Sequence, residues 1–487
     1  MTEEEFNKLK NKGFNRVPVI RKKLADLDTP LSIYLKIANE PNTYLFESVV
    51  DGERFGRYSF IGLKSDHTFE VRGKKCNELF KNKIIKSVEK EDPLEWLKEI
   101  TGRYKIAEPY GLPNFLGGFV GYFSYEIVRF IEPKVLHLSN QKDDVDILLM
   151  LSENIIIIDN LSGTVFIVSV VDTNIESGWN DAQKKLDQIE RELLSDIPKL
   201  NKININKIEF SNTVKKDEFE TWVKKIKKYI ESGDVMQVVI SHEITAYFDI
   251  EPIYFYRALR LTNPSPYMSF FNLGGTFIIA SSPEILVRLE SGKVTVRPIA
   301  GTRRRGDSKE EDLKLENDLL SDEKELAEHL MLIDLGRNDI GKIAEIGSVK
   351  LTEKMVVERY SHVMHIVSNV DCKKSKDFNA IDVLKACFPA GTVSGAPKIR
   401  AMQIIEELEK TPRGVYAGAI GYISFNGDMD LAIAIRTATI KNNVLSVRAG
   451  AGIVYDSVPE KEWEETVNKA KALINSAIIV SEDFKGI

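Results

Sequence analysis

Residues 447–457, VRAGAGIVYDS, predict a strand that runs into the tripeptide Gly450-Ala451-Gly452. Because glycine has no side chain, backbone N–H groups in such a tripeptide can approach an anion closely and could hold a carboxylate. A bulge or a tight turn is the commoner meaning of an isolated GxG. The residues on either side therefore decide whether the tripeptide binds a ligand or only bends the chain.

The residues that follow, 457–473 (SVPEKEWEETVNKAKAL), predict a helix that carries a pair of carboxylates. Ser457 can cap this helix and Pro459 can occupy its first turn. Glu462 and Glu465 are three residues apart, so they share one helix face, together with Lys469.

A second predicted helix, 321–336 (SDEKELAEHLMLIDLG), carries a matching pair, Glu325 and Glu328. Asp322 and Glu325 fit a capping box, and Gly336 fits the end of the helix. Mg²⁺ takes oxygen ligands, often one or two protein carboxylates completed by water and substrate, so one glutamate from each helix would suffice. Acidic residues on helices are more often simply solvated, and from spacing alone both interpretations stay open.

Strands and helices alternate along the chain, and several strands form hairpin-like pairs. The fold class predicted from this pattern is α/β (α+β) with substantial antiparallel sheet. The polar stretch 195–212 lacks an amphipathic period and predicts a linker between an N-terminal region, 1–200, and a C-terminal region, 212–487. The predicted strands are 115–125, 154–159, 164–171, 276–280, 293–297, 415–425 and 430–440, and a further amphipathic helix is predicted at 217–231.

Composition and charge argue against several classes of protein. The formal net charge of -6 gives no electrostatic reason to expect a nucleic-acid partner. The longest apolar runs are too short to span a bilayer, and the charged N-terminus MTEEEFNKLKNKG has no apolar core of a signal peptide. Three scattered cysteines show no zinc-ligand spacing. We expect a cytoplasmic protein without a membrane or nucleic-acid partner.

Two further features predict an anionic ligand. The glycine-rich loop PAGTVSGAPK, 389–398, ends in Lys398 and leads into a predicted helix, whose N-terminus offers unpaired N–H groups. Arg436 lies inside the apolar run LAIAIRTATI, where a charge needs a partner. A ligand carboxylate or an internal salt bridge would satisfy this arginine equally well.

Two other charged features have less specific meanings. His365, in ERYSHVMHIVSNV, can act as a general acid or base, although an isolated histidine on a strand is more often structural. Arg303-Arg304-Arg305 predict a solvated loop. Taken together, these residues predict a site for a polycarboxylate substrate with a metal, and they do not identify the substrate.

Four motifs in order make the sequence recognisable: PIAGTRRRG (298–306), KELAEHLMLIDLGRND (324–339), PAGTVSGAPK (389–398) and RAGAGIVYDSVPEKEWEET (448–466). They resemble the chorismate-utilising enzyme family over about 215–470. The segments YLFESVVDGERFGRYSFIG (44–62) and GGFVGYFSYE (117–126) resemble its N-terminal region. The resemblance implies the fold of that family, two interlocked domains with large antiparallel sheets flanked by helices.

Two positions match the anthranilate synthase branch of this family. Aminodeoxychorismate synthases generally carry a lysine nucleophile where this chain has Ala300. Isochorismate and salicylate synthases use a lysine to activate water near the position of Gln237. The resemblance therefore implies conversion of chorismate and ammonia to anthranilate and pyruvate, the first step of tryptophan biosynthesis. An aminodeoxychorismate synthase component I and a non-catalytic tryptophan-binding sensor are the alternatives.

The resemblance also implies roles for individual residues. Glu328 and Glu465 would bind Mg²⁺, with Glu325 and Glu462 in support. The remaining implied site residues are His365, Thr392 and Gln237 in catalysis, and Gly301, Thr302, Lys398, Tyr416, Arg436, Gly450, Ala451 and Gly452 in chorismate binding.

Regulation and a partner are implied in the same way. Two segments resemble the tryptophan inhibitor site of the family and predict feedback inhibition by L-tryptophan. The chain has no nucleophile-elbow cysteine followed by a histidine and a glutamate, so ammonia is expected from a separate glutamine amidotransferase subunit in a hetero-oligomer. The implied inhibitor residues are Glu47, Ser48, Asn263, Pro266, Tyr267 and Met268.

Overall fold

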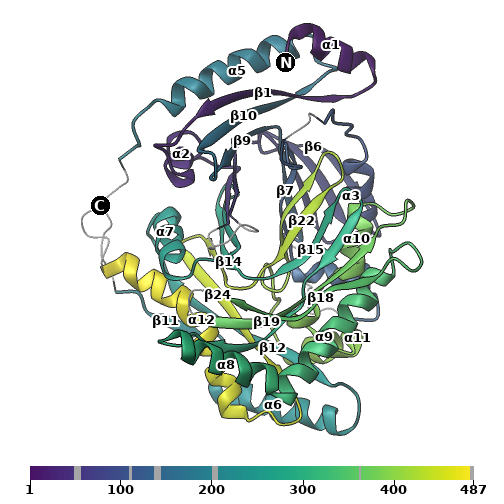
Figure 1. Ribbon diagram of the computed structural model, residues 1–487, viewed down its shortest axis with the longest axis vertical. Helices are drawn as coiled ribbons and strands as arrows, with labels where there is room; N and C mark the ends of the chain where they lie inside the picture. The colour runs from purple at the N-terminus through teal and green to yellow at the C-terminus, as the bar shows by residue number, and fades with distance from the viewer. Residues whose placement is uncertain (49–55, 109–111, 136–143, 200–206, 361–362, 483–487) are drawn as a thin grey trace.

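Two large antiparallel sheets dominate the computed structural model, which describes residues 1–48, 56–108, 112–135, 144–199, 207–360 and 363–482. Every pair of named strands is antiparallel, and helices flank both sheets (Figure 1). The predicted α/β (α+β) class with large antiparallel sheets is confirmed.

The first sheet draws its strands from both ends of the sequence. In spatial order it contains β1 (Arg16–Leu24), β10 (Thr164–Asp172), β9 (Asn154–Asp159), β3 (Tyr58–Gly62), β2 (Thr43–Glu47), β13 (Tyr267–Asn272), β14 (Thr276–Ser282), β23 (Thr437–Lys441), β24 (Val444–Ile453), β12 (Gln237–Tyr247) and β11 (Phe210–Asn212), with β20 (Gly395–Ala396) beside β12.

The second sheet is built in the same way. In spatial order it contains β17 (Ile299–Arg304), β19 (Val363–Lys373), β16 (Lys293–Val296), β15 (Ile285–Glu290), β22 (Met429–Ile433), β21 (Ala419–Ser424), β7 (Gly118–Phe123), β8 (Ile147–Ser152), β4 (His67–Arg72), β5 (Lys75–Phe80) and β6 (Lys83–Glu89), with β18 (Lys350–Arg359) beside β19.

Several helices gather at two ends of the molecule, while α3 and α10 lie at its side (Figure 1). In Figure 1, α1 and α5 lie over β1 and β10 at one end, and α6, α8, α9, α11 and α12 lie at the other. The helices are α1 (Glu3–Asn11), α2 (Pro30–Ile37), α3 (Pro93–Thr101), η1 (Tyr125–Ile127), α4 (Val128–Ile131), α5 (Gly178–Leu193), α6 (Lys216–Glu231), α7 (Pro252–Thr262), α8 (Lys309–Ser321), α9 (Glu323–Gly341), α10 (Ala380–Cys387), η2 (Gly391–Val393), α11 (Lys398–Leu408) and α12 (Pro459–Glu482).

The predicted N-terminal and C-terminal regions share both sheets. In the first sheet β2 pairs with β13, so Glu47 lies opposite Met268. In the second sheet β7 pairs with β21, so Gly121 lies opposite Gly421. The regions are therefore hydrogen-bonded to each other through their sheets. The boundary at 195–212 stays a prediction, and residues 200–206 lie outside the described part of the chain.

The chain passes from one sheet to the other at several places, and two of these crossings are neighbours in space. Between β14 and β15 it crosses at Pro283–Glu284, and between β22 and β23 it crosses at Ala434–Arg436. Two backbone hydrogen bonds join these crossings. The N–H of Ile433 donates to the carbonyl of Glu284 at 3.0 Å, and the N–H of Ser281 donates to the carbonyl of Arg436 at 3.0 Å.

The prediction of a single strand at 430–440 is wrong because of the second crossing. Its apolar run belongs to two strands in different sheets. Arg436 interrupts the run with a φ of 49°, a conformation that breaks a strand. An apolar run alone cannot reveal this break, since both halves are buried.

Two predicted helix ends are also wrong. Gly336 lies inside α9, which continues to Gly341. A Cβ at Gly336 would stand 3.2 Å from Val296 Cγ2, so the glycine permits close approach of the helix to β16. The helix predicted at 457–473 extends to Glu482. At Asp322 only half of the predicted capping box forms: its carboxylate accepts the N–H groups of Lys324 and Glu325, while the Glu325 side chain contacts Arg303 instead.

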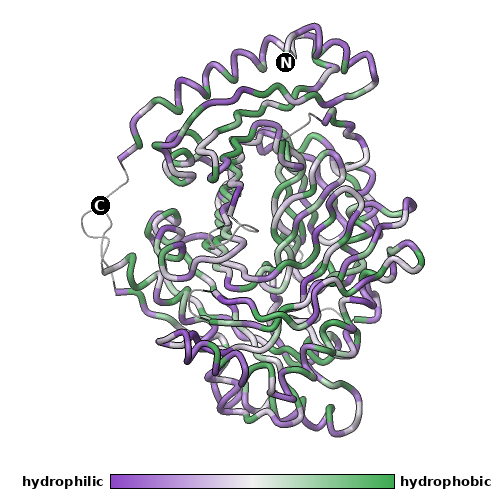
Figure 2. Tube along the Cα trace, in the orientation of Figure 1, coloured by the Kyte–Doolittle hydropathy of each residue, from purple (hydrophilic) through white to green (hydrophobic). Residues whose placement is uncertain are grey.

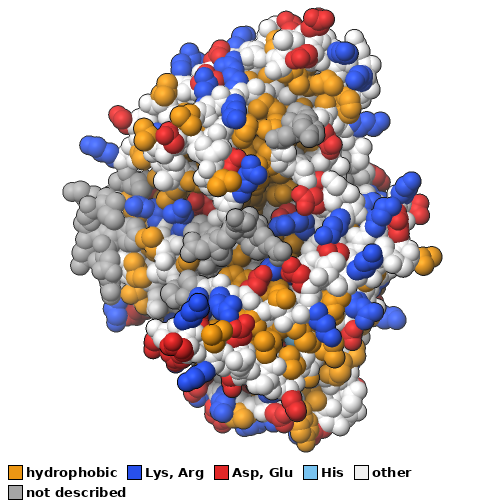
Figure 3. Space-filling view, viewed as in Figure 1, with side chains coloured by type: hydrophobic (Ala, Val, Ile, Leu, Met, Phe, Trp, Pro, Cys, Tyr) orange, Lys and Arg blue, Asp and Glu red, His pale blue; other side chains and the backbone are white. Residues whose placement is uncertain are grey.

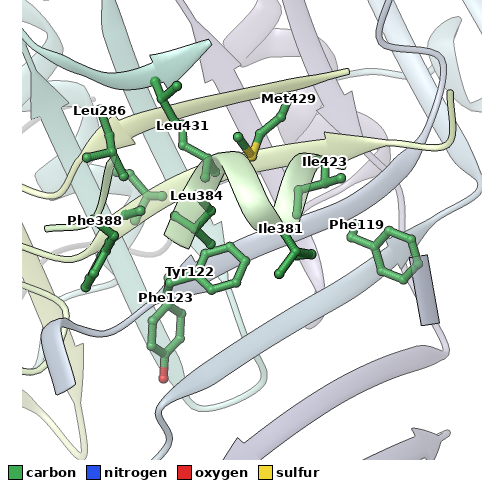
Figure 4. Packing of buried hydrophobic residues seen from close by; sticks show 14 of the residues in the cluster. Phe119, Tyr122, Phe123, Leu286, Ile381, Leu384, Phe388, Ile423, Met429 and Leu431 are labelled. Atoms are coloured by element: carbon green, nitrogen blue, oxygen red, sulfur yellow. The ribbon is translucent and has the colours of Figure 1, made fainter. Parts of the chain in front are cut away.

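A large apolar core fills the space beneath the second sheet. Ile381 and Leu384 of α10 pack against sheet residues that include Tyr122, Ile423 and Leu431 (Figure 4). Figure 2 shows hydrophobic strands inside and helices of mixed hydropathy outside. Burial of apolar area contributes roughly 25 cal/mol per Å², so this packing holds α10 against the second sheet.

A buried histidine fastens α12 to the first sheet. The Nε2 atom of His242, on β12, lies 2.8 Å from the Thr466 hydroxyl, and its ring stacks on Trp463 at 4.5 Å. These partners directly follow Glu465 and Glu462 in the sequence. The contact therefore sets which face of α12 points toward the sheet.

The surface shows no single dominant charge. On the face seen in Figure 3, lysine and arginine side chains are interspersed with aspartate and glutamate. None of the helices in the described ranges is long and apolar enough to cross a membrane.

Candidate active site

The crossing between β14 and β15 places a buried carboxylate, Glu284, which the motifs did not reveal. Only 7% of the residue is exposed. Burial raises the pKa of Glu284 to about 8, and the nearby Thr392 hydroxyl and Lys469 ammonium oppose this only in part. Glu284 therefore holds a proton at neutral pH. The one local signal was the sequence SSPE, 281–284, a carboxylate placed directly after an apolar strand and a proline.

The crossing between β22 and β23 places Arg436 close by. Burial lowers the pKa of its guanidinium, while the charges of Tyr416 and Glu465 act in the opposite direction. Within the described ranges, no carboxylate lies within 4 Å of this guanidinium. The internal salt bridge left open from sequence is therefore not found there. A desolvated guanidinium without such a partner suits a ligand carboxylate.

The tripeptide Gly450-Ala451-Gly452 forms regular strand rather than a turn. In β24, Gly450 pairs with Ser241 and Gly452 pairs with Val239 of β12. A Cβ at Gly450 would stand 2.8 Å from the Tyr416 hydroxyl, and one at Gly452 would stand 2.7 Å from Gln237 Nε2. The glycines are thus required because two predicted site residues pack directly on them.

His365 lies on β19 opposite Thr302 of β17. Its Nδ1 atom is 3.0 Å from the Gly301 carbonyl and 3.0 Å from the Thr302 hydroxyl. A carbonyl oxygen only accepts, so Nδ1 carries the proton and Nε2 is free to accept one. Burial lowers the pKa of His365, which keeps the ring neutral. The predicted Gly301, Thr302 and His365 are therefore in mutual contact.

The α9 carboxylates lie beside the same strands. Glu328 Oε1 accepts a hydrogen bond of 2.8 Å from Gln237 Nε2. Glu325 contacts Arg303 at 3.2 Å. Burial raises the pKa of the Glu325 carboxyl; Arg303 lowers it, and the charge of Glu328 raises it.

The α12 carboxylates show the same like-charge pairing. Burial raises the pKa of Glu462, and the charge of Glu465 adds to this, while Lys324 of α9 lowers it across the gap between the helices. Lys469 contacts Glu465 at 2.6 Å and donates to the Gly450 carbonyl at 3.0 Å. The α12 pair therefore lies within electrostatic range of both α9 and β24.

These two pairs fit a hard cation in their chemistry. Among the described residues, no three aspartate, glutamate, histidine or cysteine side chains gather closely enough to hold a metal by themselves. Mg²⁺ does not require such a cluster, because it keeps water and substrate oxygens as ligands. Burial and a neighbouring carboxylate raise the pKa of one member of each pair, Glu325 and Glu462, and a bound cation would oppose this effect.

Two predicted features have different surroundings from those expected. The ammonium of Lys398 forms an ion pair with Asp339 at 2.6 Å and donates to the Cys387 carbonyl at 3.4 Å. Its charge is therefore compensated by a carboxylate of the protein itself. The solvated loop predicted at Arg303-Arg304-Arg305 is wrong. Residues Ile299–Arg304 form β17, and each of the three arginines contacts a carboxylate of α8 or α9.

A separate cavity of about 430 Å³ contains most of the predicted inhibitor residues. Glu47 and Ser48, at the end of β2, face Pro266, Tyr267 and Met268. Aromatic rings dominate another wall, where Phe115 stacks on Tyr422 at 4.0 Å. An aromatic cavity with buried polar groups at one end matches the chemistry of an indole-bearing amino acid.

Asn263 does not line this cavity but anchors the segment that does. Its amide donates to the Ser281 hydroxyl at 3.0 Å, and that hydroxyl donates back to the Asn263 carbonyl at 2.5 Å. The Ser265 hydroxyl donates to the Ser282 carbonyl. The cavity wall is therefore hydrogen-bonded to the two residues that precede Pro283 and Glu284.

Comparisons with known proteins agree with the predicted family. Residues 41–475 match the model of the chorismate binding enzymes. The chain belongs to this family. Chorismate binding enzymes with solved structures include anthranilate synthase component I of Streptococcus pneumoniae, with 37% identity, a TM-score of 0.78 and coverage of 93% of this chain and 98% of that one.

Two curated proteins are similar to this chain over nearly their whole length. Anthranilate synthase component 1 of Pseudomonas putida is 50% identical over 99% of both chains. The protein of the same name from Aquifex aeolicus is 48% identical over 98% of both chains. The menaquinone-specific isochorismate synthase of Escherichia coli, 19% identical with a TM-score of 0.71, shares the fold over 97% of this chain and 98% of its own.

The raised pKa of Glu284 predicts a stability effect of Glu284→Gln. Between pH 4.5 and about 8 the folded chain keeps a proton that the unfolded chain releases, so the free energy of unfolding falls as the pH rises. The full effect is on the order of a few kcal/mol, at about 1.4 kcal/mol per pKa unit. Relative to wild type, Glu284→Gln should gain stability as the pH rises through this window.

Urea unfolding of both proteins between pH 5 and 8.5 measures this difference. Glu464→Gln, the same substitution on the exposed face of α12, controls for the change of side chain. A difference between Glu284→Gln and wild type that stays constant with pH would contradict the assignment.

Proposed function

We propose that this chain converts chorismate and ammonia to anthranilate and pyruvate. The observation that carries the proposal is the full-length identity of about half with anthranilate synthase components 1. It is supported by Arg436, whose guanidinium lies near Tyr416 and has no carboxylate within ion-pair distance among the described residues. Ala300 and Gln237 support this branch over those that use a lysine at these positions.

The two charged ends of the site would bind the two carboxylates of chorismate. Arg436, the Tyr416 hydroxyl and the N–H groups of Gly450–Gly452 would bind the enolpyruvyl carboxylate. Glu465 of α12 lies within electrostatic range of this end, since it acts on Arg436. Glu328 of α9 is connected to it through Gln237, which packs on Gly452. Charge-assisted contacts are worth roughly 1.5–3 kcal/mol each, so several are needed to hold a hydrated dianion.

Magnesium is the cofactor in this proposal. Glu328 and Glu465 would hold Mg²⁺, with Glu325 and Glu462 in support, against the ring carboxylate of the substrate. The ion would supply Lewis-acid stabilisation and a fixed orientation.

The protein's own groups provide the proton transfers. Glu284 is protonated at neutral pH and can donate to the C4 hydroxyl, which leaves as water when ammonia attacks C2. His365 has a free Nε2, which can accept the proton then lost from C2. Loss of that proton and cleavage of the C3–O bond make the ring aromatic. The leaving enolpyruvyl group takes up a proton and is released as pyruvate.

The proposal includes a partner and an inhibitor. A separate glutamine amidotransferase subunit would supply ammonia in a cytoplasmic hetero-oligomer, which the designation component 1 of the relatives supports. L-tryptophan would bind in the 430 Å³ cavity and inhibit the enzyme, because that cavity combines stacked aromatic rings with Glu47 and Ser48. Its wall is hydrogen-bonded to the strand that leads to Glu284.

The test is an assay of the purified chain with chorismate, Mg²⁺ and ammonium at alkaline pH. Anthranilate fluorescence and pyruvate should rise in equal amounts, and tryptophan should suppress both. Loss of chorismate without pyruvate would indicate an aminodeoxychorismate synthase instead. Tryptophan binding without turnover, even with an amidotransferase partner, would indicate a sensor.

Glu328→Ala should abolish Mg²⁺-dependent activity. Loss of residues that only orient metal ligands costs about 10–100-fold, so loss of a ligand should lower kcat/KM by at least that factor. Glu323→Ala, at an exposed position on α9, is the matched control and should keep near-wild-type activity. Mn²⁺ binding, followed by electron paramagnetic resonance, gives a readout independent of turnover; unchanged binding and activity would refute the metal assignment.

Ser48→Phe should relieve tryptophan inhibition while catalysis continues. The Ser48 hydroxyl is buried in the cavity wall and has no hydrogen-bond partner among the described residues, so a phenyl ring there would occupy the space proposed for the ligand. We expect the inhibitory concentration of tryptophan to rise at least about tenfold, or about 1.4 kcal/mol. The control is Ser195→Phe, at an exposed position after α5; an unchanged inhibition curve for Ser48→Phe would count against this cavity.

A further inference from the structure

A buried cluster of charged side chains lies directly behind the candidate active site, and none of its members has been placed in the site. The side chains of Arg413 and Glu409 are only 2% and 3% exposed. Arg413 contacts Glu409 through two parallel hydrogen bonds, Nε to Oε2 at 2.9 Å and Nη2 to Oε1 at 2.6 Å. Glu409 also accepts from the N–H of Ser241 at 2.7 Å, and Arg448 contacts it at 3.3 Å.

The remaining donors of Arg413 reach two separate segments of the site. Nη1 donates to the Val393 carbonyl at 2.7 Å, and Val393 follows Thr392. Nη2 donates to the Val239 carbonyl at 2.7 Å, and Val239 is the ladder partner of Gly452. One side chain therefore spans the η2 loop and the β12–β24 ladder.

The same guanidinium also faces Tyr416. Its central carbon lies 5.8 Å from the centre of the Tyr416 ring and 4.7 Å from that of Tyr125. The backbone beside Arg413 is held as well, because the Glu126 carboxylate accepts the N–H groups of Arg413 at 2.7 Å and of Gly414 at 3.1 Å. The segment that carries Tyr416 is thus fixed between the N-terminal part of the chain and the buried cluster.

Stability alone is a weak reason for this arrangement. A buried ion pair gains little over well-packed apolar side chains, because both charges must be desolvated. A guanidinium does offer what apolar groups cannot, five donors in one rigid plane. Here that plane joins one carboxylate to two carbonyls that belong to different segments of the site.

We propose that Arg413 is a positioning residue that sets the spacing of Thr392, Tyr416 and Gly452, and thereby the affinity for the enolpyruvyl carboxylate of chorismate. The inference rests on the proposed function. Arg413 acts through its neighbours and does not itself contact the substrate. Its loss should therefore weaken chorismate binding more than it affects the use of ammonia.

Arg413→Lys tests this directly, because lysine keeps the charge but cannot reproduce the planar fork. We expect the KM for chorismate and its calorimetric Kd to rise about 10- to 100-fold, the range that small misplacements of site groups produce. The KM for ammonium should change less than about twofold, because Arg413 positions the groups that bind the chorismate carboxylate. A merely structural defect would instead lower Vmax and leave both KM values unaltered. Should Arg413→Lys fail to fold, Glu409→Gln removes the charge of the partner while keeping its shape and should raise the KM for chorismate in the same direction.

Arg16→Lys is the matched control. Arg16 is also buried and pairs with Asp172 at 2.8 Å and Glu153 at 3.2 Å, but it lies on β1, at the far edge of the first sheet. It should lower the melting temperature without changing either KM.

The possible outcomes separate the two proposals. A folded Arg413→Lys or Glu409→Gln enzyme with wild-type affinity for chorismate would overturn the positioning role alone. Equal increases in the KM for chorismate and for ammonium would overturn it as well. A wild-type chain that neither binds nor converts chorismate would overturn the proposed function, and the positioning role with it.

Discussion

The structure depends on a pair of neighbouring chain crossings between two sheets. Each sheet needs its strands to be hydrogen-bonded edge to edge, so the chain can leave one sheet for the other only where a ladder ends. At Pro283–Glu284 and at Ala434–Arg436 it does so side by side, and the two crossings share backbone hydrogen bonds. Glu284 and Arg436, which would be costly to bury inside either sheet, are thereby placed where the crossings meet. Among the described residues, Glu284 has no cationic side chain and Arg436 has no carboxylate within ion-pair distance.

The electrostatics of the site follow from that placement. Burial raises the pKa of Glu284 and lowers that of Arg436, so the charged form of each group is less stable here than in water. Such groups reduce the stability of the empty protein and gain most from a ligand of complementary charge. The α9 and α12 carboxylates provide the opposite charge at the other side of the site, and His242 holds α12 in place.

The same crossings connect the site to the rest of the molecule. The β13–β14 ladder joins the wall of the aromatic cavity to Ser281 and Ser282, which precede Pro283 and Glu284. On the other side, Arg413 joins the η2 loop and β12, while Glu126 holds its backbone. Parts of the chain that are more than 250 residues apart therefore determine the geometry of one small site.

Local patterns in the sequence were enough for several strands and for both carboxylate helices. β9 has the predicted bounds 154–159, because a β-branched run ending at a turn is a local signal. Both carboxylate helices and the glycine strand also follow from spacing within a few residues. The sequence motifs alone indicated the family, since they occur in order along nearly the whole chain.

Only the tertiary structure decided what the buried charges do. The apolar run around Arg436 contains no signal for a change of sheet, since both of its strands are buried. Glu284 could not be recognised, because burial raises its pKa and only the folded structure buries it; Thr392 and Lys469, which oppose this shift, are also distant in sequence. The fork of Arg413 likewise acquires its role only when folding brings Val239 and Val393 within hydrogen-bond distance. Sequence patterns report local geometry, whereas desolvation and pairing depend on neighbours that only the fold brings together.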